Sequence, residues 1–430
     1  MKHRTIIEPF RIKSVEPLRL STEEERVRHL AAAHYNPFLL ASEHVIIDLL
    51  TDSGTSAMSA QQWAGVMVGD EAYAGSQSWG RMERAVRDLT GFSHILPTHQ
   101  GRAAERIIYG RLGGPGKRFV SNTHFDTTRA NIEVTGATAI DLPIAEGRDP
   151  EVEHPFKGNL DVAALARLLA DDAGPVAAVI LTVTNNTGGG QPVSLANATA
   201  VSALCRAHGV PFLLDCCRIA ENSWFIRHRE PGMSDVPYRE IARRMFALAD
   251  GAVMSAKKDG LANMGGFLAL RDEALADACR NLLIISEGFT TYGGLSGRDM
   301  EAIAIGLEEV FDDHYLEYRI RSTTYLGDHL HALGVPLMRP IGGHAVYVDA
   351  RRLSGILRHG DVRVQAARVH AAMDLVRLAI PRRVYTQSHI EYVAETFEQV
   401  LARREGARGL RIVREPKLLR HFSAHFLPLP

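Results

Sequence analysis

The stretch AAVILTVTNNTGGGQPVSLANATAVSALCRAHGVPFLLDC, residues 177–216, decides the fold of this chain. Two short apolar runs within it, AAVILTVT and PFLLDC, have the composition of buried β-strands. The segment between them, SLANATAVSALCRAHG, begins with Ser194 as a candidate helix N-cap and ends in a glycine. A strand, a helix and a second strand in this order indicate a parallel sheet.

The same alternation extends from about Arg118 to Leu270. Further strand-like runs are RFVSN, GAVMSA and GGFLAL, and the segment LDVAALARLLADD has helical periodicity. The predicted fold class is therefore α/β with a mainly parallel sheet. The chain ends mix amphipathic helices such as RIRSTTYLGDHLHALG with short strands such as HAVYVDA. We predict a large domain over residues 56–310 and a smaller α/β domain formed by residues 1–55 and 311–430.

Composition excludes several classes of function. The 430 residues contain 49 Lys plus Arg and 50 Asp plus Glu, a formal charge of −1, which argues against general attraction to nucleic acid or anionic membranes. The N-terminal residues lack the apolar run of a signal peptide, and no run approaches the roughly 18 apolar residues of a membrane span. The four cysteines show no C-x-x-C spacing, which favours a reduced, cytoplasmic setting. The adjacent Cys216 and Cys217 are interpreted as small buried side chains, with a redox or metal pair as the alternative.

Polar residues follow three of the predicted strands. Ligands of doubly wound sheets bind beyond the carboxyl ends of the strands, so these positions are candidate site residues. They are Asn185 with Asn186, Asp215, and Ser255 with Lys257 and Lys258. A carboxylate and an amine at neighbouring strand ends suit a cofactor that needs both, and pyridoxal phosphate is one such cofactor. The alternative is that both lysines are solvated loop residues.

The adjacent lysines have a chemical interpretation. A lysine that forms a Schiff base attacks as the neutral amine, whereas an unperturbed lysine has a pKa of about 10.4. A second cation and desolvation lower that pKa, so we expect Lys257 to assist Lys258. Asp215 would pair with the ring nitrogen of the cofactor. The phosphate would lie at the start of the predicted helix in PTHQGRAAERIIYG, although an ordinary helix start explains that segment equally well.

The chain also contains, in this order, the strings LLTDSGT, GDEAYAG, PTHQGR, GGQPVSLAN, SAKKD, EGFTTYGGL, GGHAVYVDA, IPRRVYT and EPKLLRHF. This series resembles the β-eliminating aromatic amino-acid lyases, the tyrosine phenol-lyases and tryptophanases, from about Pro9 to about Phe426. The resemblance implies a fold-type I pyridoxal phosphate enzyme, transferase-like, with a seven-stranded sheet in the large domain. It also implies a homotetramer, a dimer of dimers with active sites at the dimer interface, and a nearby K⁺ ion.

The resemblance carries a cofactor site onto this chain. Lys258 matches the lysine that holds the cofactor, Lys257 its neighbour near the phosphate, and Asp215 the partner of the ring nitrogen. Three further residues match groups that surround the cofactor ring in the family. Asn186 and Arg218 match the groups near O3′ of the cofactor, and Phe125 matches the aromatic side chain that stacks on the ring. The phosphate cradle matches Gln100, Gly101, Arg102 and Ser255.

The substrate and cation residues are implied in the same way. Arg382 matches the clamp on the substrate carboxylate, and a guanidinium fork suits that target. Thr51 would help to place the substrate, and Tyr73 matches a general acid contributed by the neighbouring subunit. The cation site matches Glu71, the Gly54 carbonyl and Asn263, with an ordinary surface carboxylate as the alternative for Glu71.

The leaving group is the least determined feature. Asp126 and His421 are the residue types of tryptophanases, whereas IPRRVYT and GGHAVYVDARR are more similar to phenol-lyases; His421 is equally consistent with a core histidine. The segment between Arg352 and Arg377 is much shorter than in the family and lacks the part that carries the phenol-recognising arginine, which argues against tyrosine. We predict β-elimination of a tryptophan-like or modified aromatic L-amino acid. The alternatives are transamination, β-replacement or retro-aldol cleavage of an unusual amino acid, and a protein without turnover.

Overall fold

The computed structural model describes residues 5–356, 373–416 and 422–429. Its central sheet has seven strands in the order β1-β7-β6-β5-β4-β2-β3. Their bounds are β1 (His94–Thr98), β2 (Arg118–Ser121), β3 (Thr138–Asp141), β4 (Val176–Thr182), β5 (Phe212–Asp215), β6 (Gly251–Ser255) and β7 (Gly266–Leu270). Neighbours from β6 to β3 are parallel, and β7 is antiparallel to both β1 and β6. The predicted mainly parallel seven-stranded sheet is confirmed.

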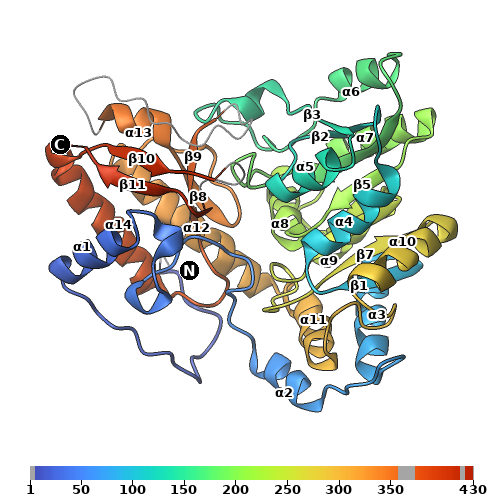
Figure 1. Cartoon of the computed structure of the whole chain (residues 1–430), viewed down its shortest axis with the longest axis horizontal. Helices are drawn as coiled ribbons and strands as arrows, with labels where there is room; N and C mark the ends of the chain where they lie inside the picture. Colours follow the sequence, from blue (N-terminus) through green and yellow to red (C-terminus); the bar gives the residue numbers. More distant parts are fainter. Residues whose placement is uncertain (1–4, 357–372, 417–421, 430) are drawn as a thin grey trace.

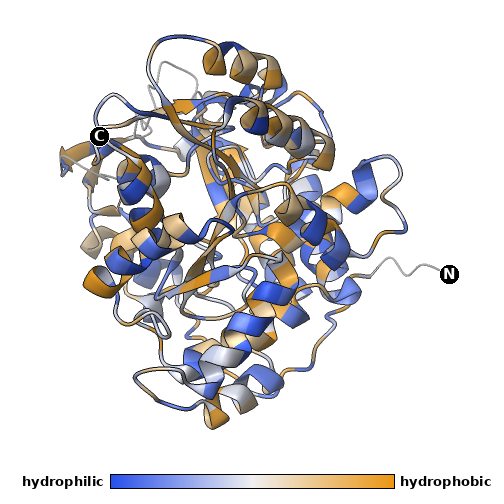
Figure 2. Ribbon diagram, turned by 90° about the vertical axis from the view of Figure 1, so that its right-hand side faces the viewer, coloured by the Kyte–Doolittle hydropathy of each residue, from blue (hydrophilic) through white to orange (hydrophobic). Residues whose placement is uncertain are grey.

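Helices cover both faces of this sheet (Figure 1). They are α3 (Gln77–Thr90), α4 (Gly101–Leu112), α5 (Asp126–Glu133), α6 (Val162–Leu169), α7 (Leu195–His208), α8 (Ile219–Arg229), α9 (Tyr238–Ala247) and α10 (Glu273–Ser286). Alternate strand residues enter different cores, because successive side chains point to opposite faces. Val179 and Leu181 pack with residues of α3, α7 and α9, whereas Ala178 and Ile180 pack with residues of α4, α5 and α10. Figure 2 accordingly shows mainly hydrophobic strands inside a shell of two-coloured helices.

The strand-helix-strand unit of residues 177–216 forms as the sequence predicts. The side chain of Ser194 caps α7 by accepting a hydrogen bond from the Asn197 amide, and Gly209 ends the helix in a left-handed conformation with φ of 64°. Strand β5 then returns parallel to β4. Strands β1 and β3 were not among the predicted runs. Both are edge strands, and β1 contains Pro97, a residue that sheets tolerate mainly at their edges.

A second apolar core joins the two ends of the chain. It contains residues of the long helix α12 (Asp313–Ala332), of α14 (Gln387–Ala402) and of the antiparallel pair β8 (Ala345–Asp349) and β9 (Leu375–Ala379). Ile47 and Leu49 from the N-terminal segment pack against it. Figure 1 likewise places the N-terminal and C-terminal segments on the same side of the molecule. We propose the division into residues 56–310 and 1–55 with 311–430 on the basis of this shared core.

Shorter elements complete the chain. The remaining helices are α1 (Glu23–Ala32), α2 (Ala60–Val68), α11 (Gly297–Glu309) and α13 (Ala350–Ile356), with short 3-10 turns at Pro37–Leu39, Ser42–His44, Ala145–Arg148 and Arg404–Gly406. Strands β10 (Leu410–Arg414) and β11 (His425–Pro428) form a separate antiparallel pair. Within the described ranges, none of the helices combines the length and the apolar character that crossing a membrane requires.

Candidate active site

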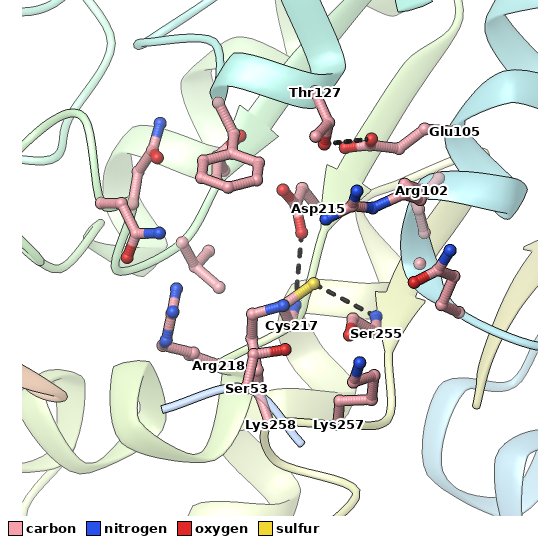
Figure 3. A pocket seen from close by; sticks show the side chains of 18 residues that line it. Ser53, Arg102, Glu105, Thr127, Asp215, Cys217, Arg218, Ser255, Lys257 and Lys258 are labelled. Atoms are coloured by element: carbon pink, nitrogen blue, oxygen red, sulfur yellow. Dashed lines mark hydrogen bonds between the residues drawn. The ribbon is translucent and has the colours of Figure 1, made fainter. Parts of the chain in front are cut away.

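One pocket lies at the carboxyl ends of the central parallel strands. Thr182 of β4 is in register with Asp215 of β5, and Asp215 with Val253 of β6, so the ends of three neighbouring strands are level. All three residues line the pocket, which encloses about 630 Å³ including space open to solvent (Figure 3). This is the position where ligands bind in doubly wound sheets.

The structure brings all of the predicted cofactor residues to this pocket. Its lining includes Gln100, Gly101, Arg102, Phe125, Asn186, Asp215, Arg218, Ser255, Lys257 and Lys258. These residues come from five separate segments of the chain. Their convergence supports the cofactor assignments, which the sequence alone makes from short motifs.

The start of α4 forms one end of the pocket. Gln100 is extended, and the helix begins at Gly101, so the first amides of the helix have no partners within it and favour an anion. A Cβ atom at Gly101 would lie only 2.7 Å from the Cβ of Ser255, so a glycine permits this close approach. Partial burial, followed by the charges of Lys258 and Arg102, lowers the pKa of Lys257. The cations and the helix start together make a site for a phosphate group.

The middle of the pocket carries a carboxylate and an aromatic ring. Asp215 ends β5, and its Oδ1 accepts a hydrogen bond of 3.4 Å from the Cys217 amide. Phe125 immediately precedes α5. Asn186 is held by two residues from the later part of the chain, since its Oδ1 lies 2.6 Å from Nε2 of His344 and 3.2 Å from the hydroxyl of Tyr347.

The two adjacent cysteines have different surroundings. Cys216 is buried, as predicted, whereas Cys217 is half-buried and lines the pocket. The Sγ of Cys217 accepts a hydrogen bond of 3.2 Å from the Ser255 amide. The prediction of two buried side chains is therefore wrong for Cys217, because its side chain turns toward the strand-end pocket. Burial and the charge of Asp215 raise the pKa of the Cys217 thiol, which stays neutral and is a poor nucleophile.

Arg382 lies in a buried network of charges instead of lining the pocket. Its Nη1 is 2.9 Å from Oδ2 of Asp52, and its Nη2 is 2.8 Å from Oε1 of Glu221 and 2.9 Å from Oδ1 of Asp259. Asp52 also accepts hydrogen bonds of 2.9 and 2.8 Å from the guanidinium of Arg218. Arg382 and Arg218, the two arginines that the resemblance assigns to substrate and cofactor, are thus joined by one carboxylate.

The carboxylates of this network differ in their electrostatics. Burial opposes the charge of Asp52, but Arg218, His344 and Arg382 hold the pKa of Asp52 well below its usual range. Burial raises the pKa of Asp259 to about 6 although Arg382 opposes this, and the negative charge of Glu221 adds to the rise. Asp52 is therefore held in its charged form, whereas Asp259 takes up a proton at a higher pH than Asp52 does.

Several predicted substrate residues lie away from the pocket. Tyr73 is 73% exposed, with its ring centroid 5.5 Å from that of Phe289. Asp126 is half-buried at the start of α5, and the hydroxyl of Thr51 accepts a hydrogen bond from the amide of Ser53, which does line the pocket. His421 lies outside the described residues, as do residues 357–372 of the shortened segment.

The predicted cation residues are only partly brought together. The Gly54 carbonyl accepts a hydrogen bond of 3.1 Å from Nδ2 of Asn263. Glu71 instead contacts the start of α11, where its carboxylate lies 3.0 Å from Nε of Arg298 and 3.2 Å from the Gly297 amide. Over the described ranges of the chain, no three His, Cys, Asp or Glu side chains form a group that could hold a metal ion.

Sequence reasoning did not identify some of the pocket residues. The polar ones are Ser53, Glu105, Thr127, Thr182 and Cys217. Helical periodicity could have identified Glu105, because it follows Gly101 by one turn and so lies on the same face of α4. Ser53 and Thr127 lie within the motifs LLTDSGT and FDTT, next to residues that were identified.

The groups in the pocket match the chemistry of pyridoxal phosphate. The pocket provides an amine to hold the cofactor, a carboxylate at ring height, an aromatic side chain and a helix start with two nearby cations for the phosphate. The fold is similar to that of a serine palmitoyltransferase from Sphingomonas wittichii, with a TM-score of 0.60, 15% identity and coverage of 89% of this chain and 96% of that chain. It is also similar to a threonine aldolase from Leishmania major, with a TM-score of 0.58, 16% identity and coverage of 81% and 98%. The fold and the pocket define a pyridoxal phosphate enzyme of fold type I.

Sequence comparison then gives the family. The model of the β-eliminating lyases matches residues 48–396, and the chain belongs to this family of lyases. A tryptophanase from Hyphomonas neptunium is 54% identical over 98% of this chain and 99% of its own length, and one from Salinibacter ruber is 55% identical over 99% and 96%. A tyrosine phenol-lyase from Pasteurella multocida is 44% identical over 98% of both chains.

Proposed function

We propose that this lyase cleaves L-tryptophan or a related β-substituted aromatic L-amino acid to pyruvate, ammonia and the leaving group. The observation that carries this proposal is the difference in similarity between two kinds of relative. The tryptophanases from Hyphomonas neptunium and Salinibacter ruber are 54% and 55% identical to this chain, a probable tryptophanase from Aeropyrum pernix is 47% identical, and the tyrosine phenol-lyase from Pasteurella multocida is 44% identical. The lack of the phenol-recognising segment points in the same direction, because a site without that donor loses its preference for tyrosine.

The residues of the pocket divide the work of elimination. Bound pyridoxal phosphate supplies an electron sink for negative charge that develops at the substrate α-carbon. The start of α4, Arg102 and Lys257 would hold the phosphate, and Asp215 would pair with the ring nitrogen. The amine of Lys258 would hold the cofactor and, with substrate bound, would serve as the base for the α-proton. Arg382 binds the substrate carboxylate after exchanging part of its contact with Asp52.

The proton for the leaving group is assigned to Tyr73 of a second copy of the chain. In its own subunit Tyr73 is exposed and does not line the pocket. We therefore propose a homotetramer, a dimer of dimers in which each pocket receives Tyr73 from its neighbour. A K⁺ ion near the Gly54 carbonyl, Asn263 and Glu71, and a cytoplasmic location, belong to the same proposal.

Replacing Tyr73 by phenylalanine is expected to lower kcat for elimination by about 10² to 10⁴-fold, the usual contribution of a general acid. KM should change little, because the phenol acts on the leaving group and not on the bound amino acid. The exchange of the substrate α-proton with deuterated water should continue, since Lys258 performs it. Tyr392→Phe, at another exposed tyrosine, is the matched control. Equal losses of exchange and elimination in Tyr73→Phe would contradict the assignment.

The function itself is tested with the purified holoenzyme and a panel of amino acids. We expect pyruvate from tryptophan, with kcat/KM at least about tenfold above that for tyrosine, because the chain lacks the segment that carries the phenol-recognising arginine in phenol-lyases. S-alkylcysteines should also react, as their leaving groups are good. Failure to release pyruvate from any of them, or a preference for tyrosine, would contradict the proposal.

A different reaction on the same cofactor is the second candidate. The observation that favours it is the shortened segment between Arg352 and Arg377, which lacks the part that carries the phenol-recognising arginine in phenol-lyases. Transamination, β-replacement or retro-aldol cleavage of an unusual amino acid would then replace elimination. Analysis of products by mass spectrometry separates these reactions, because elimination loses the side chain and transamination retains it.

A further inference from the structure

Glu105 is a buried carboxylate in the pocket that the proposed mechanism does not use. It lies on α4, one turn after Gly101, and is 5% exposed. Its carboxylate accepts a hydrogen bond of 2.7 Å from the hydroxyl of Thr127, a second from the hydroxyl of Thr128, and one of 3.4 Å from the amide of Asn131. All of these donors are uncharged groups of α5, and in the part of the chain that the structure describes no arginine or lysine forms an ion pair with Glu105.

A second carboxylate lies in the same pocket. In the view of Figure 3, Asp215 lies between Glu105 with Thr127 on one side and Lys257 with Lys258 on the other. Two carboxylates in a pocket that excludes much of the water repel each other, so one of them favours the protonated form. Asp215 accepts a hydrogen bond from the Cys217 amide and has the lysines nearby, whereas Glu105 lies at the end away from the lysines.

Titratable and charged groups from several elements surround Glu105. Burial and the negative charge of Asp215 raise the pKa of Glu105 to about 7, while the hydroxyls of Thr128 and Thr127 and the charge of Lys258 act against this rise. Tyr109, one turn further along α4, is buried and neutral, because burial and the charge of Glu105 raise its pKa. The remaining titratable and charged groups that line the pocket are Arg102 on α4, Cys217 and Arg218 after β5, and Lys257 after β6.

We propose that Glu105 is a positioning residue that holds a proton beside the cofactor ring. When Glu105 is protonated, Asp215 is the one negatively charged side chain among the described residues that line the pocket. When Glu105 is deprotonated, its charge repels that of Asp215 and so changes the electrostatic potential at the ring nitrogen with which Asp215 is proposed to pair. In both forms its hydrogen bonds to Thr127 and Thr128 connect α4, whose start is assigned to the phosphate, to α5. Helix α5 directly follows Phe125, the residue assigned to stack on the ring. The inference rests on the proposed pairing of Asp215 with the ring nitrogen.

The sign of the pH dependence follows from these contacts. The threonine hydroxyls donate to the carboxylate, so they favour its charged form. Removing them should raise the pH at which Glu105 loses its proton. Replacing Glu105 by glutamine should remove the titration, because the amide carries no charge at any pH while it keeps one acceptor for the threonines.

The test is a pH titration of the holoenzyme without substrate, between pH 5.5 and pH 8.5. Its readouts are the absorption band of the bound cofactor and the infrared C=O band of protonated carboxyl groups. We expect a transition with a midpoint near pH 7 in the wild type, its loss in Glu105→Gln, and a shift to higher pH in Thr127→Val with Thr128→Val. Glu83→Gln, at a half-buried carboxylate on α3, should leave the midpoint unchanged.

An unchanged midpoint in Glu105→Gln would overturn the proposal. If Glu105→Gln does not retain the cofactor, the variant with Thr127→Val and Thr128→Val tests the proposal instead. A titration midpoint of that variant that equals the wild-type value or lies below it would also overturn the proposal. Asp259, whose pKa is about 6, contributes a separate carboxyl band that Glu105→Gln should leave in place. Because the titration needs no substrate, absence of pyruvate release would contradict the proposed function without deciding the role of Glu105.

Discussion

Lys258→Ala is expected to lose covalent attachment of the cofactor and to lower kcat by at least about 10³-fold, because one amine both holds the cofactor and accepts the α-proton. The phosphate cradle, Asp215 and Phe125 remain, so the variant should still bind pyridoxal phosphate reversibly. The measurement is the cofactor absorbance before and after dialysis, together with pyruvate release. Borohydride reduction followed by peptide mass spectrometry should label Lys258 in the wild type.

Lys257→Ala is the comparison that makes this prediction specific. Lys257 lines the same pocket, and its lowered pKa reflects partial burial and then its cationic neighbours, Lys258 and Arg102. Its loss should weaken cofactor binding and slow catalysis by about 10 to 100-fold while attachment persists, since it removes one phosphate contact. Lys13→Ala, at an exposed lysine, should behave as wild type. Equal effects at positions 257 and 258 would show that the pair has been assigned wrongly.

The second large effect is expected at Asp52. This carboxylate is fully buried and contacts both Arg218 and Arg382. Removing one partner of a buried ion pair leaves uncompensated charge, so Asp52→Asn should lower the free energy of unfolding by about 3 to 5 kcal/mol. It should also lower kcat/KM, because the arginines assigned to the cofactor and the substrate carboxylate lose their common anchor. Chemical denaturation and steady-state kinetics measure the two effects.

Asp259→Asn is the matched control for Asp52→Asn. Asp259 is equally buried and also contacts Arg382, but its pKa is raised to about 6. Its surroundings therefore tolerate the neutral form, which asparagine resembles, and the loss of stability should be below about 1 kcal/mol. A loss at Asp259 as large as that at Asp52 would contradict this interpretation of the network.

The two carboxylates also predict opposite pH dependences. The folded pKa of Asp52 is lowered, so its contribution to stability is present above its unfolded value of 3.8 and is lost only as the pH falls through the folded value. The folded pKa of Asp259 is raised, so its contribution is complete below 3.8 and is lost as the pH rises through about 6. Asp259→Asn should therefore flatten the fall in stability between about pH 4 and pH 6.

The residues that the sequence assigns to a cofactor line one pocket, and they lie at positions with a local signature. Asp215 and Lys258 follow apolar strands, and Gln100 and Gly101 precede a helix, so strand ends and a helix start locate them. The central strands were predictable for a similar reason, since they are continuous apolar runs. The edge strand β1 was not, because Pro97 interrupts its apolar run.

The buried charge network around Arg382 could not be predicted from short sequence motifs. Asp52, Arg218 and Arg382 are separated by more than 160 residues at each step, and their contacts depend on packing between the chain ends and the central sheet. The resemblance assigned separate roles to the two arginines and gave none to the aspartate that joins them. Glu105 was missed for a related reason, because its partners lie on a different helix.

The fate of L-tryptophan carrying carbon-13 at its carboxyl, α and β carbons tests the account most directly. With the purified holoenzyme, mass spectrometry should detect labelled pyruvate, ammonia and an unlabelled indole ring, in equal amounts. This result would establish that the bond between the β-carbon and the ring is broken, as the family and the pocket lead us to expect. A labelled product in which the three carbons remain joined to the ring, or no product, would contradict the assignment of this chain as a lyase of tryptophan.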